Sequence, residues 1–139
     1  MPVSYTFLDD GRGTIWTGWG RLTGAELIDK VKEATACWKS AAPFLYGFYD
    51  YSSVTEMDIS TPQVRELASI GVEASKYRPD GAISAIYATS DLSFGLARMW
   101  QAFTDQPDWD TAVFRERSAA VAWLKERVAT RFGFRASLQ

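Results

Sequence analysis

The sequence lacks histidine entirely and contains one cysteine, Cys37. Without histidine, the Ser/His and Cys/His nucleophile arrangements and every histidine-containing metal site are excluded. A single cysteine cannot form an intramolecular disulfide, and Cys37, beside Trp38 on an apolar helical stretch, is expected to be a buried structural thiol. No glycine-rich run ends in Lys followed by Ser or Thr, so a phosphate-binding loop is absent. We therefore expect no enzymatic activity, no cofactor and no bound metal.

Long apolar runs and a strong charge of either sign are also missing. No apolar stretch approaches the roughly 18 residues needed to span a bilayer, and no basic segment followed by an apolar run opens the chain. These features predict a cytoplasmic protein without a membrane span. The net charge of −2 supplies no global positive field, so nucleic acid is not an expected partner.

The composition that is present indicates one packed domain covering residues 1–139. A chain of 139 residues fits a single domain of ordinary size and leaves no room for a second core. Apolar residues make up 47% and aromatic residues 14% of the chain, which favours a globular fold over disorder. The core is expected to be rich in aromatic side chains.

Hydrophobic periodicity predicts strands alternating with helices. Strands are expected over 4–8, 14–19, 44–50, 82–89 and 111–114. Helices are expected from Gly24, from Thr61, after Ser90, and from a cap at Ser118 to about Arg131. Between the third strand and the second helix, residues 51–61 are expected to form a polar turn. The order ββαβαβαβα predicts an α/β sandwich with a mixed five-stranded sheet and four helices, antiparallel at the first hairpin.

Two local signals are specific about where elements begin and end. Thr23 followed by Glu26 is a capping box, and Leu22 and Leu27 flank it as a hydrophobic staple. Gly18 and Gly20 weaken the end of the second strand and suggest a bulge. We expect the strand to stop near these glycines and the first helix to follow.

The first candidate site is a group of hydroxyls that leads into the second helix: Ser52, Ser53, Thr55, Ser60 and Thr61. Backbone N–H groups and the helix dipole stabilise anions at such a place, so it is a candidate phosphate or phosphorylation site. The ordinary interpretation, which base rates favour, is that Ser60 or Thr61 caps the helix.

The second candidate is the set of carboxylates Asp50, Glu56 and Asp58 in the same region. Acids held close together can perform acid/base or metal chemistry. These three follow no ligand or catalytic spacing, so solvation of a strand end is the favoured interpretation.

The third candidate is an aromatic ligand pocket lined by Trp16, Trp19, Tyr46, Tyr49, Tyr51 and Trp100. Aromatic side chains line binding clefts as well as cores, and core packing is the default for most of them. We expect Trp16 and Trp19 to lie on one strand face, partly exposed.

The segment 111–139 is locally basic, with six Arg and Lys residues against two Glu residues. The basic residues are Arg115, Arg117, Lys125, Arg127, Arg131 and Arg135. This segment is either a docking face for an acidic partner or an ordinary solvated helix face.

The element order and the stretch YDYSSVTEMDISTPQV resemble the STAS domain, the fold of bacterial anti-sigma-factor antagonists (SpoIIAA-like). That family places a Met-Asp-Ser-Ser-Gly motif at the start of the second helix. Here Met57 and Asp58 match it, Ile59 replaces the first serine, Ser60 occupies the phosphorylatable serine and Thr61 replaces glycine. The stretches SDLSFGLARMWQAF and AVFRERSAAVAWL resemble a branch of SpoIIAA-like, STAS/SEC14-like proteins of unknown function.

The resemblance implies a non-enzymatic regulatory domain that a partner kinase or regulator modifies at Ser60, the added charge disrupting docking. Its interaction surface would include Ser52, Ser53, Thr55, Glu56 and Met57. The alternative is a carrier that holds a small apolar molecule or lipid in the aromatic pocket. A homodimer supported by exposed aromatic residues such as Trp109 is left open.

Overall fold

The computed structural model describes residues 2–40, 44–76, 81–106 and 109–139, without the side chains of residues 37–40. The prediction of a buried thiol at Cys37 therefore lies outside the described residues. The elements are β1 (Val3–Leu8), a 3-10 turn (Asp9–Gly11), β2 (Gly13–Thr23), α1 (Gly24–Ser40), β3 (Tyr46–Asp58), α2 (Thr61–Ser75), β4 (Ala82–Tyr87), α3 (Asp91–Phe103), β5 (Trp109–Phe114) and α4 (Arg117–Phe132).

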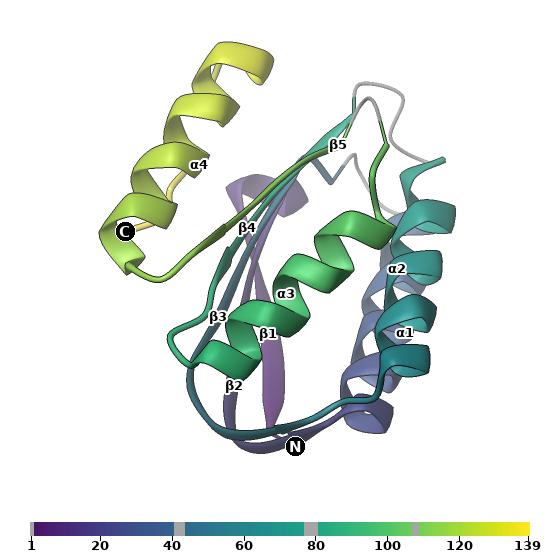
Figure 1. Ribbon diagram of the computed structural model, residues 1–139. Helices are drawn as coiled ribbons and strands as arrows, with labels where there is room; N and C mark the ends of the chain where they lie inside the picture. The colour runs from purple at the N-terminus through teal and green to yellow at the C-terminus, as the bar shows by residue number, and fades with distance from the viewer. Residues whose placement is uncertain (1, 41–43, 77–80, 107–108) are drawn as a thin grey trace.

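The five strands form one mixed sheet in the spatial order β1-β2-β3-β4-β5. β1 and β2 pair antiparallel through the tight hairpin, and the remaining three pairs are parallel, each connected by a helix. The predicted α/β class and element order are thus confirmed. Helices α1, α2 and α3 lie on one side of the sheet and α4 on the other, as Figure 1 shows.

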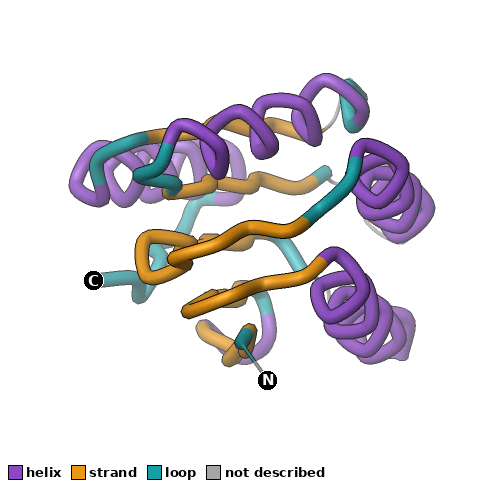
Figure 2. Tube along the Cα trace, turned by 60° about the horizontal axis from the view of Figure 1, so that its bottom comes forward, coloured by secondary structure: helices purple, strands orange, loops and turns teal. Residues whose placement is uncertain are grey.

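Each face of the sheet carries its own core. Figure 2 shows the strands stacked between helices on both sides. One core packs α4 against β3 and β4 around Tyr46, Phe48 and Leu124. The other joins Trp16 and Leu22 of β2 with the apolar faces of α1 and α2. In the described part of the chain, no helix has the length and apolar character needed to cross a membrane.

The third strand is longer than predicted, because the expected turn over 51–61 is extended backbone as far as Asp58. β2 likewise continues past its glycines to Thr23. Gly18 and Gly20 lie at shifts of the β2–β3 register, so the predicted bulge is present but the predicted strand end there is wrong. The hydroxyl-rich segment stays extended since β2 supplies partners for its backbone.

The helix starts follow local capping chemistry. Thr23 and Glu26 form the predicted reciprocal bonds at the start of α1, and Leu22 and Leu27 are buried beside them. Ser90 caps α3 as predicted. The prediction that Ser118 caps the last helix is wrong, since α4 begins at Arg117 after Glu116. At its other end Gly133 adopts φ 75°, a left-handed conformation that glycine reaches at little cost.

The C-terminal segment after α4 returns to the first hairpin, an arrangement the sequence did not indicate. Ala136 and Leu138 are buried in the α4-side core. Between them, the backbone N–H of Ser137 donates to Asp9 Oδ2 at 3.1 Å, and the Tyr46 hydroxyl donates to the same oxygen at 2.5 Å. Partial burial opposes the charge of Asp9, but the bonds from Ser137 and Tyr46 outweigh it and lower the pKa of this carboxyl. We call the contact of Asp9 with Tyr46 and Ser137 the tail clamp.

Candidate functional site

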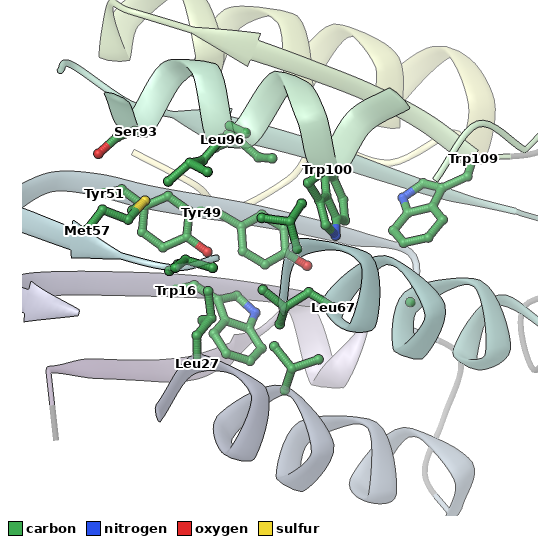
Figure 3. A pocket seen from close by; sticks show the side chains of 16 residues that line it. Trp16, Leu27, Tyr49, Tyr51, Met57, Leu67, Ser93, Leu96, Trp100 and Trp109 are labelled. Carbon is green, nitrogen blue, oxygen red and sulfur yellow. The ribbon is translucent and has the colours of Figure 1, made fainter. Parts of the chain in front are cut away.

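An apolar cavity lies between the sheet and the layer formed by α1, α2 and α3. Its volume is about 90 Å³. Figure 3 shows Trp16, Tyr49 and Tyr51 projecting from β2 and β3, with Leu67 of α2 and Leu96 and Trp100 of α3 around them. The lining residues are Trp16, Leu27, Val31, Tyr49, Tyr51, Met57, Ile59, Val64, Leu67, Gly71, Ile86, Ser93, Leu96, Ala97, Trp100 and Trp109.

The floor of the cavity is a row of rings across neighbouring strands. Trp16 of β2 lies opposite Tyr49 of β3 in the parallel register, and their rings stack at a centroid distance of 5.6 Å. Tyr5 of β1 extends the row on the other side of Trp16, with centroids 4.8 Å apart. These three rings form a continuous aromatic surface on the face of the sheet that carries the core shared with α1 and α2.

Three glycines make room for three aromatic residues of the lining. A Cβ atom on Gly18 would lie 3.0 Å from the Tyr51 ring, and one on Gly47 would lie 2.9 Å from the Tyr49 ring. A Cβ atom on Gly71 would lie 2.6 Å from Trp109 Cη2. A Cβ atom would require the ring to shift at Gly47 and Gly71 and would crowd it at Gly18, so the glycines leave the space that these rings occupy.

Two of the indole N–H groups around the cavity already have partners in the protein. Trp16 Nε1 donates to Thr14 Oγ1 at 3.1 Å, and Trp109 Nε1 donates to Ser84 Oγ at 3.0 Å. The Tyr51 hydroxyl differs, because burial, with a contribution from nearby Tyr49, raises its pKa strongly. It is therefore neutral at physiological pH and available to donate a hydrogen bond.

Four of the residues predicted to line a pocket surround this one cavity: Trp16, Tyr49, Tyr51 and Trp100. Trp19 does not line it and is 42% exposed, whereas Trp16, which was expected to be partly exposed, is only 1% exposed. Trp16 and Trp19 are three residues apart, so strand alternation places them on opposite faces rather than the same face as expected. Strand alternation along β3 likewise directs Tyr46 away from Tyr49 and into the α4-side core. Whether the cavity binds a ligand stays a prediction.

Ser60 caps α2, and its surroundings are those of a helix start. Its hydroxyl accepts the backbone N–H of Gln63 at 3.3 Å while the Gln63 side chain accepts the N–H of Ser60 at 2.9 Å. Ser60 and Thr61 are both exposed. The capping interpretation is thus confirmed for Ser60, and Thr61 is the first helical residue.

The candidate carboxylates do not come together as a set of three. Asp58 and Glu56 both pair with Arg21, at 2.6 and 2.9 Å, across the exposed ends of β2 and β3. Asp50 instead accepts the backbone N–H and the hydroxyl of Ser52 at 2.9 and 2.6 Å. In the described part of the chain, no group of three or more Cys, Asp or Glu side chains is placed to hold a metal ion.

The predicted interaction surface is divided by strand alternation. Ser53, Thr55 and Glu56 are exposed, whereas Met57 is 8% exposed and lines the cavity. Trp109 was expected to be exposed, but it is likewise only 8% exposed. The structure thus excludes Met57 from the surface and Trp109 from an exposed dimer contact.

The basic C-terminal segment pairs in part with acids of the same chain. Arg115 contacts Asp91 at 2.9 Å, and Arg127 and Arg131 both approach Asp110, at 3.7 and 3.3 Å. The Arg115–Asp91 pair is exposed, and pairs of that kind contribute little stability, whereas the Arg131–Asp110 pair is partly buried. They fit the solvated-face interpretation, while docking of an acidic partner stays a prediction.

On the helical side of the cavity, the sequence identified only Trp100. Leu27, Val64 and Leu67 lie on buried faces of α1 and α2, and such a face gives the same apolar pattern whether it meets other side chains or a cavity. The available signal was the presence of glycine inside β3 and α2, at Gly47 and Gly71, where close approach by a large side chain is one of few explanations.

Comparison with known proteins identifies the fold. No family model and no curated protein matches the sequence. A solved structure is similar to this chain: an uncharacterised protein from the DUF3478 family with a SpoIIAA-like fold, from Shewanella loihica PV-4. The TM-score is 0.55 at 16% sequence identity, covering 88% of this chain and 93% of that chain. The chain therefore has the SpoIIAA-like fold that its sequence suggested. An identity this low bears on fold alone.

Proposed function

We propose that this SpoIIAA-like domain is a non-enzymatic binding protein that holds a small apolar molecule between its sheet and the layer of α1, α2 and α3. The observation that carries the proposal is the aromatic cavity. Protein interiors are normally packed as densely as organic crystals. A pocket of about 90 Å³ with an apolar lining departs from that packing, and its apolar surface is free to contact a ligand.

The size and lining of the cavity limit the ligand. Apolar cavities stay dry and accept apolar guests, and one of about 150 Å³ is enough for benzene. The present cavity is smaller, so a single ring or a short branched chain matches it better than a long lipid. Partly accessible lining residues such as Ile59 and Leu96 allow a somewhat longer molecule to extend past the rim.

Filling the cavity should abolish binding without unfolding the protein. Ala97 is 7% exposed and lines the cavity from α3, so Ala97→Leu adds three carbon atoms inside it. We expect binding of ethylbenzene to weaken at least tenfold, and the free energy of unfolding to stay constant or rise by about 0.5–2 kcal/mol, as for other cavity-filling changes. NMR titration of the indole N–H signals measures the binding, and urea unfolding measures the stability.

The matched control is Ala102→Leu, the same change at an exposed position of the same helix. It should leave ethylbenzene affinity unchanged. Wild-type binding that survives Ala97→Leu intact would place the ligand elsewhere, and a wild-type protein that binds no apolar probe would rule out the proposed function.

A second candidate function is regulation through protein interaction at the start of α2. The supporting observation is that Ser60 is exposed and its hydroxyl lies at the positive end of the helix dipole. A phosphoryl group there would add negative charge near the Arg21–Asp58 pair. The protein partner would be a kinase that phosphorylates Ser60 or a regulator whose binding depends on the phosphoryl charge.

Substitution of Ser60 separates its capping role from a regulatory one. Ser60→Ala should lower the free energy of unfolding by about 1 kcal/mol, while Ser60→Asp should retain most of the cap. If regulation operates, intact-mass analysis of the protein from its native host should detect phosphorylated Ser60. Unmodified protein under every growth condition would remove phosphorylation from this candidate.

A further inference from the structure

The polar groups that face the cavity determine which hydrogen bonds a ligand can form there. Of the aromatic residues in the lining, Tyr51 and Trp100 have side chains with no hydrogen-bond partner among the described residues. An indole N–H can only donate, and buried polar groups are normally satisfied. Leaving such a group unpaired in an apolar site costs about 1–3 kcal/mol. The Trp100 N–H can therefore donate to a ligand, and the Tyr51 hydroxyl can donate or accept.

Tyr51 is the better placed of the two donors. Figure 3 shows its ring between the sheet and α3, with Met57 and Leu96 nearby. Burial raises the pKa of its hydroxyl strongly, although the residue retains part of its accessible surface. The strong pKa shift and the remaining accessible surface are both explained when the accessible part of Tyr51 faces the cavity and not bulk water. Gly18 leaves room for the ring there, because a Cβ atom at residue 18 would lie 3.0 Å from it.

The charge of the lining excludes one class of ligand. Among the residues that the structure describes, neither Lys nor Arg lines the cavity. Moving an unpaired carboxylate from water into an apolar site is far more costly than moving a neutral polar group. A carboxylate would therefore have no compensating cation, whereas an uncharged oxygen acceptor would need only a donor.

We propose that Tyr51 is the specificity-determining residue of this cavity, and that the ligand is a neutral apolar molecule with one hydrogen-bond acceptor such as a ketone or ether oxygen. This inference rests on the proposed binding function. Tyr51 donates to the acceptor while the rings of Trp16 and Tyr49 contact the apolar body. Acidic ligands such as fatty acids or aromatic acids are rejected.

The test compares three probes of similar shape by NMR titration at pH 7: acetophenone, ethylbenzene and benzoate. Tyr51→Phe removes the hydroxyl and keeps the ring. We expect it to weaken acetophenone binding about three- to tenfold, the usual effect of one neutral hydrogen bond, and to change ethylbenzene binding less than twofold. Wild-type protein should bind benzoate at least tenfold more weakly than acetophenone.

The matched control is Tyr87→Phe, the same change on the opposite face of the sheet, where Tyr87 packs against the α4-side core. It should alter neither affinity. Equal losses of acetophenone and ethylbenzene on Tyr51→Phe, or benzoate binding as tight as acetophenone binding, would overturn the role of Tyr51 while leaving the proposed function intact. If wild-type protein binds none of the neutral probes, both proposals fail.

Discussion

Replacing Trp109 with alanine is expected to lower the free energy of unfolding by about 3–5 kcal/mol, the range seen for large buried aromatic residues. Trp109 is 8% exposed and meets Trp100 edge to face at a centroid distance of 5.4 Å. Its indole N–H is also the partner of the fully buried Ser84 hydroxyl. The substitution would enlarge the cavity and leave that hydroxyl unpaired. Urea unfolding followed by circular dichroism gives the difference.

A substitution at Gly71 provides the control for this prediction, because it tests the contact between α2 and the Trp109 ring by adding an atom at Gly71. A Cβ atom there would lie 2.6 Å from Trp109 Cη2, so Gly71→Ala should destabilise by about 1–3 kcal/mol through overpacking. Alanine is intrinsically better than glycine inside a helix by about 1 kcal/mol. In a Trp109→Phe background, which lacks the clashing atoms, Gly71→Ala should therefore become neutral or stabilising. Additive effects of the two substitutions would contradict the contact.

The parts of the fold that the sequence predicted are those determined by local chemistry. A capping box requires only residues three apart, so Thr23 with Glu26 was identified from the sequence. The cap of α2 was predicted as Ser60 or Thr61, and the structure shows that it is Ser60. Element order follows from apolar periodicity within each segment, and it was correct throughout. The length of β3 was not predictable, because its hydroxyl-rich part is extended only through pairing with β2. Here tertiary pairing overrides local propensity.

The shape of the cavity could be predicted only in part from the sequence. Most of the aromatic residues on its sheet side were predicted, yet two of the three glycines that shape it contact rings distant in sequence: Gly18 meets Tyr51, and Gly71 meets Trp109. No local pattern links such a pair. In contrast, the alternation of side chains along β2 would have been enough to predict that Trp19 lies on the opposite face from Trp16. The tail clamp also lay beyond local signals, because Asp9 and Ser137 stand at opposite ends of the chain.

Replacing Asp9 with alanine should lower the free energy of unfolding by about 3 kcal/mol and release the C-terminal segment. The Tyr46 hydroxyl, on a side chain with no exposed surface, would lose its acceptor at a cost of about 1–3 kcal/mol. Asp9 also has a φ of 53°, a left-handed conformation that costs alanine more than aspartate. Chemical denaturation measures the first effect, and faster hydrogen exchange at residues 134–138 measures the second.

Acidification should reproduce part of this loss in the wild-type protein. The pKa of Asp9 is below its ordinary value of 3.8 in the folded state, so its ionised form stabilises the fold at every pH above that value. The contribution declines as the pH falls through the lowered folded pKa and protons bind. Asp9→Asn keeps a residue that tolerates the left-handed conformation but cannot ionise, so its stability should depend less on pH between about 5 and 2. Equal pH dependence in both proteins would show that the Asp9 charge does not hold the C-terminal segment.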